Sequence, residues 1–260
     1  MTMNAALKLT VDDVRQRVSK EEWEVRVKLA ACYRLVAHYG WDDLVYTHIS
    51  ARVPGPHHHF LINPYGVMFE EVTASSLVKV DIDGNVVLDN GYAINPAGYT
   101  IHSAIHAARE NAGCVLHLHT NAGVAVSAQK HGLLPITQTA MIFTNQIAFH
   151  DYEGIALNLD ERERLVADLG DKDVMLLRNH GTLTVGRDVP GAFTRMFFFE
   201  RACQMQIAAL SAGYDRVNFP PQAAIDTVEQ QGKHGMDKAG QLEWPALLRK
   251  LDRIDPSYRD

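Results

Sequence analysis

The sequence has few features of a membrane protein or a secreted protein. Only three of its 260 residues are cysteines, which are odd in number and far apart, as expected for reduced core thiols rather than a disulfide framework. No stretch approaches the roughly 18 uncharged apolar residues that a membrane span needs. Even the richest segment, 192–212, contains Arg195, Glu200 and Arg201. Residues 1–11 lack the apolar centre of a signal peptide. We therefore expect a cytoplasmic protein without a membrane partner.

The sequence also lacks an excess of positive charge. It has 25 lysines and arginines against 31 aspartates and glutamates, a formal net charge of −6 at pH 7. This sign disfavours binding to nucleic-acid phosphates and to anionic lipids. The sequence contains neither a GxGxxG fingerprint nor a P-loop motif. We therefore expect a small-molecule substrate and no nucleic-acid partner.

The length and composition fit one globular domain. With 47% hydrophobic residues, a chain of 260 residues can bury a large core, and nothing in the composition calls for a second one. We predict a single domain over 1–260, with a core at about 22–213 and a C-terminal extension over 214–260. Segment 218–241 is polar and weakly patterned, so we expect a loose connection there, followed by a last helix at 244–253.

Helical signals occur along much of the chain. Ser19 followed by Glu22 is a capping-box pattern, and it begins an apolar helical repeat that ends near Gly40. Pro190 lies near the start of another helical segment, which ends at Gly213. Further helices are predicted at 98–109, 122–130 and 160–170.

The segments between these helices have the character of strands and hairpins. Strands are predicted at 45–53, 59–62, 78–82, 86–88, 114–119 and, in two parts, 174–185. A Pro-Gly-Pro sequence separates the first pair and Asp83-Gly84 the second, as is typical of hairpins. Hairpins join antiparallel strands. We therefore predict an α/β fold of three layers, α/β/α, with a largely antiparallel central sheet.

Three histidines form the strongest candidate site. His117 and His119 lie two residues apart in a strand pattern, so both side chains point to one face while the flanking leucines point to the other. Alone, this pair fits buried, hydrogen-bonded histidines equally well. His180 follows an apolar strand in an Asn-His-Gly turn, where Gly181 permits a tight turn. Three imidazoles with an open coordination position predict a catalytic divalent-metal site.

Other residues have weaker signals. His102 and His106 are spaced by four residues on a predicted helix, but no acidic residue of an HExxH motif stands between them, so we favour a structural role. Residues 57–59 are three histidines after Pro-Gly-Pro and predict a solvated turn. Tyr258 is close enough to the end of the chain to be an ordinary tail residue, although such a residue can reach a site.

Six segments, taken together and in this order, resemble the class II aldolase and adducin family. They are Cys32-Tyr33-Arg34-Leu35, Tyr46-Thr47-His48-Ile49-Ser50-Ala51-Arg52, Ile62-Asn63-Pro64-Tyr65-Gly66, Val72-Thr73-Ala74-Ser75-Ser76-Leu77-Val78, His117-Leu118-His119-Thr120 and Leu177-Arg178-Asn179-His180-Gly181. The resemblance covers roughly 22–213 and is closest to the adducin-like branch. It implies that His117, His119 and His180 hold one divalent metal ion per subunit, zinc first, with manganese or iron also compatible. It also implies a homo-oligomer, a tetramer in many relatives.

The resemblance further implies an acid/base carboxylate after the Pro-x-Gly turn. Aligning 66–70 with the aldolases assigns this role to Glu70, and a carboxylate near a dication can move a proton. Adducin-like sequences favour an acid at Glu71 instead. We therefore expect Glu70 as the acid/base group, with Glu71 as its rival.

This chain departs from the aldolases where they bind phosphate. The relatives that bind sugar phosphates have small residues whose free backbone N–H groups surround the phosphate. Here segments 46–49 and 63–66 carry bulkier residues, and Pro64 has no N–H donor. The expected substrate is therefore a hydroxy-carbonyl compound or keto acid without a phosphate.

A second departure concerns proton transfer. The tyrosine that the family aldolases use as a proton donor aligns near Thr139, which has no phenol. His48 could instead contact a carboxylate or hydroxyl of the substrate, as a third catalytic candidate beside the two glutamates, although a structural role on a strand fits it as well. The residues that we expect to bind substrate are Asn63, Tyr65, Thr139 and Asn179.

Three functions fit these patterns. The first is a metal-dependent lyase that breaks a carbon–carbon bond by aldol cleavage or decarboxylation, through an enolate that the metal stabilises. The second is a non-haem iron oxygenase or a dehydratase on the same scaffold. The third is a binding module without catalysis, as the resemblance to adducin heads allows. We favour the lyase.

Overall fold

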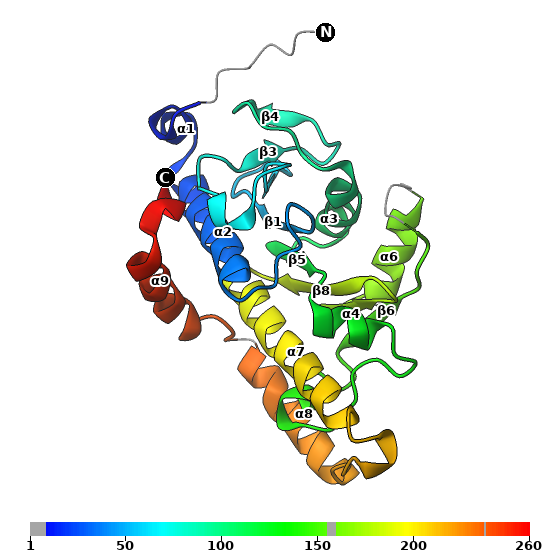
Figure 1. Cartoon of the computed structure of the whole chain (residues 1–260). Coiled ribbons are helices and arrows are strands. Elements are labelled where there is room, and N and C mark those ends of the chain that lie inside the picture. Colours follow the sequence, from blue (N-terminus) through cyan, green and yellow to red (C-terminus); the bar gives the residue numbers. More distant parts are fainter. Residues whose placement is uncertain (1–8, 155–159, 237) are drawn as a thin grey trace.

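The computed structural model of the chain describes residues 9–154, 160–236 and 238–260 (Figure 1). Within these ranges, eight strands form one sheet in the order β4-β3-β2-β1-β5-β8-β7-β6. They are β1 (His48–Arg52), β2 (Phe60–Ile62), β3 (Val78–Val80), β4 (Val86–Leu88), β5 (Cys114–Leu118), β6 (Ile147–His150), β7 (Val174–Leu177) and β8 (Gly181–Gly186). All neighbouring strands are antiparallel except β6 and β7, which are parallel. The predicted largely antiparallel sheet and both hairpins are confirmed.

Helices cover both faces of this sheet, so the molecule has three layers (Figure 1). The longer helices are α2 (Lys20–His38), α3 (Pro96–Ala108), α6 (Glu161–Leu169), α7 (Val189–Leu210), α8 (Gln222–Met236) and α9 (Glu243–Ile254). The shorter ones are α1 (Val11–Arg17), α4 (Asn121–Ser127), α5 (Gln138–Met141), η1 (Phe69–Glu71), η2 (Tyr214–Arg216) and η3 (Pro256–Arg259). None of the helices in the described ranges is long and apolar enough to span a bilayer.

The alternation of side chains along β5 connects the layers. Leu116 and Leu118 join the hydrophobic cluster that includes α2, α7 and α9. Val115 points to the opposite face and packs with Ile105 of α3 and Leu165 of α6. Because side chains alternate along a strand, His117 shares the face of Val115. The predicted separation of the β5 leucines from the histidine face is therefore present in the fold.

The start of α2 uses only half of the predicted capping box. The Ser19 hydroxyl accepts a hydrogen bond from the Glu22 backbone N–H at 3.1 Å. The Glu22 carboxylate, however, accepts from the Arg26 guanidinium at 3.0 Å and from Lys79 at 2.7 Å. This buried group of charges connects α2 to β3, so Glu22 links two elements in addition to its place at the start of a helix.

The prediction of a loose connection over 218–241 is wrong, because most of this segment forms α8. Its sequence is polar because the helix packs little apolar surface, with Ile225 as a buried residue at 6% exposure. A Cβ added at Gly232 would lie 2.9 Å from Ile142, which shows how closely the helix approaches the end of α5. The last helix, predicted at 244–253, is confirmed as α9.

The C-terminal residues pack against the core. The Tyr258 side chain is fully buried, and its hydroxyl donates a hydrogen bond to Asp252 at 2.7 Å. The Ala74 N–H donates to the Tyr258 carbonyl at 3.1 Å, and the Ser75 N–H donates to Asp260 at 2.8 Å. Tyr258 therefore has a structural role in the core, rather than being the ordinary tail residue that the sequence suggested. The predicted boundary between a core at about 22–213 and an extension stays a prediction.

Candidate metal centre

The three candidate ligands meet because two antiparallel strands end at the same edge of the sheet. In the pairing of β5 with β8, His117 lies opposite Leu183 and Leu118 lies opposite Thr182. His119 directly follows β5, and His180 directly precedes β8. The end of one strand and the beginning of its neighbour therefore bring all three histidines to one point.

The distances between the rings suit a shared cation. Each histidine offers one ring nitrogen, and these nitrogens lie within 4.8 Å of one another. The Nε2 atoms of His117 and His119 are 3.0 Å apart. Tetrahedral zinc with Zn–N bonds of about 2.0–2.1 Å would hold neighbouring ligand nitrogens about 3.3 Å apart. Small side-chain adjustments therefore suffice for the three imidazoles to bind one ion.

Hydrogen bonds on the outer nitrogens orient two of the rings. The Nδ1 atom of His117 lies 3.0 Å from the carbonyl of Thr182, and Nδ1 of His119 lies 3.0 Å from the Asp43 carboxylate. If each Nδ1 carries the proton and donates, the Nε2 lone pair faces the other rings. Such outer partners are typical of metal-binding histidines, because they fix both the tautomer and the ring orientation.

Burial favours the uncharged form that a metal needs. Removal from water holds the pKa of His117 well below its usual value, and the neighbouring histidines lower it further. The same two causes lower the pKa of His180 to about 4. Both rings are therefore neutral at pH 7, with a lone pair available for a cation.

The Asn-His-Gly turn has a steric reason. Asn179 has a φ of +56°, in the left-handed region that asparagine tolerates better than most residues. A Cβ at Gly181 would lie 2.5 Å from the Leu118 carbonyl and within 3.2 Å of His119 and His117 ring atoms. Glycine is therefore required for β8 to begin this close to the end of β5.

His48 lies beside the three histidines. It is opposite His117 in the pairing of β1 with β5 and is 6% exposed. Neither ring nitrogen has a hydrogen-bond partner in the described part of the chain, and burial is the main cause that lowers its pKa to about 4. A Cβ at Gly98 would lie 2.4 Å from the ring, so α3 covers it closely. An unpaired, neutral imidazole at this place can give or accept a hydrogen bond.

The two candidate glutamates lie in η1 and are exposed. The Glu71 carboxylate accepts a hydrogen bond from the Met68 N–H at 3.0 Å. Among the interactions of the described residues, neither Glu70 nor Glu71 contacts the three histidines. The structure thus brings His48 to the candidate site but leaves both carboxylates outside direct contact.

The predicted substrate-binding residues are spread over the fold. Asn63 is buried, and its amide oxygen accepts from the Tyr33 hydroxyl at 3.0 Å, so this side chain supports the core. Tyr65 is 47% exposed after β2, and Asn179 is exposed next to His180. Thr139 lies in α5, which packs against α7 and α8. Of these four residues, Asn179 is the sequence neighbour of a candidate ligand.

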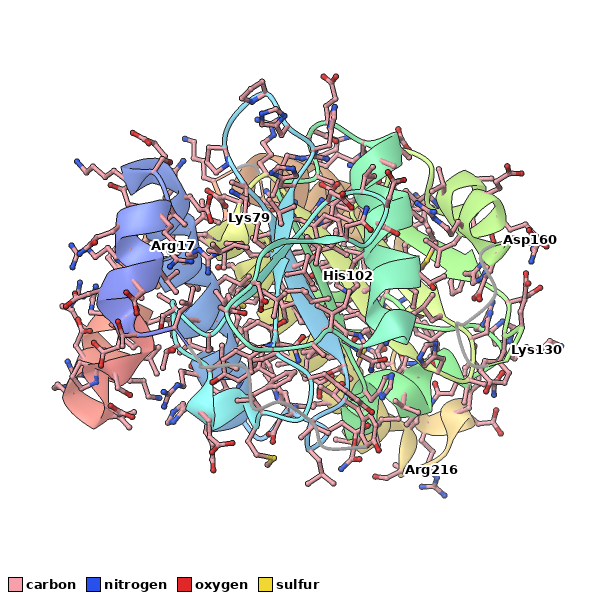
Figure 2. All side chains as sticks on the ribbon, turned by 90° about the horizontal axis from the view of Figure 1, so that it is seen from above. Arg17, Lys79, His102, Lys130, Asp160 and Arg216 are labelled. Atoms are coloured by element: carbon pink, nitrogen blue, oxygen red, sulfur yellow. The ribbon has the colours of Figure 1, made fainter. Side chains whose placement is uncertain are left out.

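The two histidines of α3, His102 and His106, take part in hydrogen bonds within the core. The Ser50 hydroxyl lies 2.6 Å from Nδ1 of His102 and 2.7 Å from Nε2 of His106. The remaining Nδ1 of His106 lies 3.0 Å from the Ala112 carbonyl. His102 lies in the middle of the view in Figure 2, whereas Lys130 and Arg216 lie at its rim. This pair is part of the core between α3 and β1.

Sequence reasoning missed three residues around the site. Asp43 contacts His119 from the loop before β1, and Tyr152 has its ring centroid 6.3 Å from that of His180. Glu200 of α7 is 2% exposed, accepts a hydrogen bond from the Thr120 hydroxyl at 2.5 Å, and has a pKa raised by burial. None belongs to a local motif. Asp43 and Tyr152 meet the candidate ligands from separate loops, and Glu200 contacts Thr120, the residue after His119. The buried glutamate in the apolar pattern of α7 was the one available signal.

Comparison with known proteins agrees with this fold. Residues 27–207 match the model of the class II aldolase and adducin N-terminal domain. A Caulobacter vibrioides protein, whose name assigns it provisionally to the class 2 aldolases, is 61% identical over 95% of this chain and 96% of its own length. Rat α-adducin is 40% identical over 98% of this chain but only 37% of its own length.

Solved structures extend the comparison. An aldolase II superfamily protein from Pseudomonas syringae has a TM-score of 0.91 at 58% identity, over 95% of this chain and 99% of that one. L-fuculose 1-phosphate aldolase from Glaciozyma antarctica has a TM-score of 0.77 at 27% identity, over 96% of this chain and 95% of that one. The chain belongs to the class II aldolase and adducin family.

Proposed function

We propose that this protein is a metal-dependent lyase that acts on a small hydroxy-carbonyl compound or keto acid without a phosphate. The observation that carries the proposal is the convergence of ring nitrogens from His117, His119 and His180, all within 4.8 Å of one another. Three protein ligands leave an open position for a substrate oxygen, as catalytic sites require. The relative named L-fuculose 1-phosphate aldolase supports carbon–carbon bond cleavage as the reaction type.

The bound metal would supply a Lewis acid that polarises a carbonyl oxygen. Groups of the protein itself would orient the metal ligands and bind the substrate. The Thr182 carbonyl and Asp43 hold the outer nitrogens of His117 and His119 and so aim the ligands. His48, whose ring nitrogens are unpaired within the described residues, would hydrogen-bond to a substrate hydroxyl or carboxylate.

Glu70 stays our candidate for proton transfer. Its rival Glu71 already accepts a hydrogen bond from the Met68 N–H, whereas no hydrogen bond engages Glu70 in the described part of the chain. An exposed carboxylate on a short 3-10 helix can approach a ligand once substrate is bound. Glu70→Gln is expected to lower turnover while leaving the metal content unchanged, and Glu71→Gln is expected to change turnover less.

The proposed substrate class rests on features of the turn at 63–66. Pro64 offers no N–H, and Asn63 is fastened to Tyr33, so the turn at 63–66 is poorly suited to surround a phosphate. We therefore propose hydroxy-ketones and short keto acids as the substrates to test first. We also propose that the protein acts in the cytoplasm as a homo-oligomer, with a tetramer as the first expectation from the family.

Metal analysis tests the central claim. Purified protein without a tag is expected to hold about one divalent ion per chain, and His180→Ala is expected to lose most of it because one ligand is gone. His131→Ala removes an exposed histidine outside this site and serves as the matched control. Stoichiometric zinc or manganese supports the lyase, while stoichiometric iron with oxygen consumption supports an oxygenase. Absence of metal from the wild type after reconstitution rejects the proposal.

The second candidate function is a binding module without catalysis. It is favoured by the 40% identity to rat α-adducin over nearly the whole of this chain. The match covers 37% of the length of that adducin. Turnover of any hydroxy-ketone or keto acid that disappears in His180→Ala would decide for the lyase.

A further inference from the structure

One exposed aromatic residue borders the candidate metal centre. Tyr152 lies in the segment after β6, and its ring stands edge-on to that of His180, with centroids 6.3 Å apart and an interplanar angle of 69°. The side chain is 55% exposed. A half-exposed ring adds little to the core, and its position places a tyrosine next to a candidate ligand.

His150, two residues before this tyrosine, has several hydrogen-bond partners. His150 is 3% exposed, and both of its ring nitrogens contact carboxylates of α6: Nδ1 lies 2.7 Å from Asp168 and Nε2 lies 3.3 Å from Glu161. Its carbonyl accepts a hydrogen bond from the Arg178 N–H at 2.8 Å. The end of β6 is thereby bound both to α6 and to the strand that leads to His180.

The residue after the tyrosine is held by the same helix. The Glu153 carboxylate accepts from Nε of Arg164 at 2.7 Å and also from its Nη2. A bidentate pair of this kind constrains direction as well as distance. His150 and Glu153 both contact α6, so the chain is held by this helix on either side of Tyr152.

We propose that Tyr152 is a substrate-contacting residue of the metal centre, whose phenol hydroxyl donates a hydrogen bond to an oxygen of the bound substrate. This inference rests on the proposed function. A phenol donates well to an oxygen on which negative charge grows, and such donors are most effective when they are held in place beforehand. Arg164 is a positioning residue, because it acts on the substrate only through Glu153 and Tyr152.

The test uses the cobalt-loaded protein and acetohydroxamate, a bidentate oxygen ligand that changes the visible spectrum of Co²⁺. Tyr152→Phe keeps the ring and removes the hydroxyl. We expect an unchanged affinity for Co²⁺ and about tenfold weaker binding of acetohydroxamate, the usual effect of losing one hydrogen bond to a polarised oxygen. Tyr214→Phe is the matched control, since Tyr214 is 54% exposed and lies in η2, and it is expected to bind like the wild type.

The outcomes separate the two proposals. A wild type that binds no Co²⁺ rejects the proposed function and, with it, this inference. A wild type that binds Co²⁺ and acetohydroxamate, together with a Tyr152→Phe variant that binds both equally well, overturns the role of Tyr152 alone. Normal Co²⁺ binding with selective loss of acetohydroxamate affinity supports it.

A second variant tests how the tyrosine is held. Arg164→Ala releases Glu153 while leaving the phenol in the protein, and we expect about threefold weaker binding of acetohydroxamate. Arg164→Lys restores one ion pair and should recover part of the affinity. If Arg164→Ala has no effect in the wild-type background, or if it weakens binding equally in Tyr152→Phe, the positioning role is wrong.

Discussion

Two groups of histidines lie on the same face of the sheet, and they differ in what their nitrogens meet. In the first group, Nε2 of His117 and Nε2 of His119 face each other at 3.0 Å. In the second, the Ser50 hydroxyl stands between His102 and His106 at 2.6 and 2.7 Å. The first group has lone pairs available for a cation, whereas the second has already used most of its hydrogen-bonding capacity within the core.

This difference shows why spacing alone cannot identify a metal site. A spacing of two residues on a strand places two imidazoles on one face, and so does a spacing of four residues on a helix. A third ligand and the absence of a bridging hydroxyl decide between the two outcomes. His180 supplies the third ligand at the sheet edge, while Ser50 supplies the bridge beneath α3.

The largest expected effects come from replacing one histidine in each group by alanine and comparing metal binding with stability. His119→Ala should weaken metal binding at least about 100-fold, because a three-ligand site becomes a two-ligand site, with little change in stability for this half-buried residue. His106→Ala should keep the metal but lower the free energy of unfolding by about 2–4 kcal/mol, because Ser50 and the Ala112 carbonyl lose a buried partner. Metal analysis and urea denaturation measure the two effects.

Two outcomes would contradict this prediction. If folded His106→Ala loses its metal, the second group belongs to the site, and the contrast between the groups fails. If His119→Ala retains stoichiometric metal with wild-type affinity, His119 is not a ligand. The urea midpoint of each variant, measured with a chelator present, controls for metal-linked stability.

The next prediction concerns acid. Burial lowers the pKa of His106 to about 3 and holds that of His102 well below its usual value, against about 6.5 in the unfolded chain. Since the unfolded chain takes up protons first, this stability is fully present above about pH 6.5 and is lost as the pH falls from there toward the folded-state pKa. Below about pH 5.5 each such histidine should lower the free energy of unfolding by about 1.4 kcal/mol per pH unit.

A variant isolates the contribution of one histidine. His106→Gln keeps a polar side chain but does not titrate. As the pH falls, the free energy of unfolding of this variant should therefore decrease less steeply than that of the wild type. The difference between the two slopes should correspond to about one bound proton. Urea denaturation of both proteins between pH 4.5 and 7, with the metal removed, measures the two slopes. Equal slopes would show that His106 does not stay neutral in the folded protein.

The sequence allowed much of the fold and part of the site to be predicted. The hairpins were predictable because turn residues separate β-rich segments, and the convergence of His117 and His119 follows from the alternation of a strand. Helix α8 was not, because it buries so little apolar surface that its pattern is weak. Asp43 and Tyr152 were not, because they reach the histidines through loops whose course depends on tertiary packing.

A smaller effect is expected from the residue that orients the His119 ring. The Asp43 carboxylate lies 3.0 Å from Nδ1 of His119, and its side chain is 47% exposed. Asp43→Asn keeps the shape but removes the charge that makes the imidazole a better ligand. We expect about tenfold weaker metal binding, at the lower end of the usual range because water reaches this pair. Competition with a chelator measures it, and an unchanged affinity would mean that Asp43 does not orient the ring.

The smallest expected effect concerns the turn that presents His180. Asn179 is exposed and has a φ of +56°, so glycine should replace it with a change in stability of a few tenths of a kcal/mol, whereas alanine should cost about 1 kcal/mol in this left-handed conformation. Metal affinity should follow the same order, because strain in the turn shifts the His180 ring. Urea denaturation and chelator competition compare Asn179→Gly with Asn179→Ala. Equal behaviour of the two variants would show that the asparagine is not needed for its backbone conformation. Loss of turnover in Asn179→Gly, with normal metal binding and stability, would instead assign its amide to the substrate.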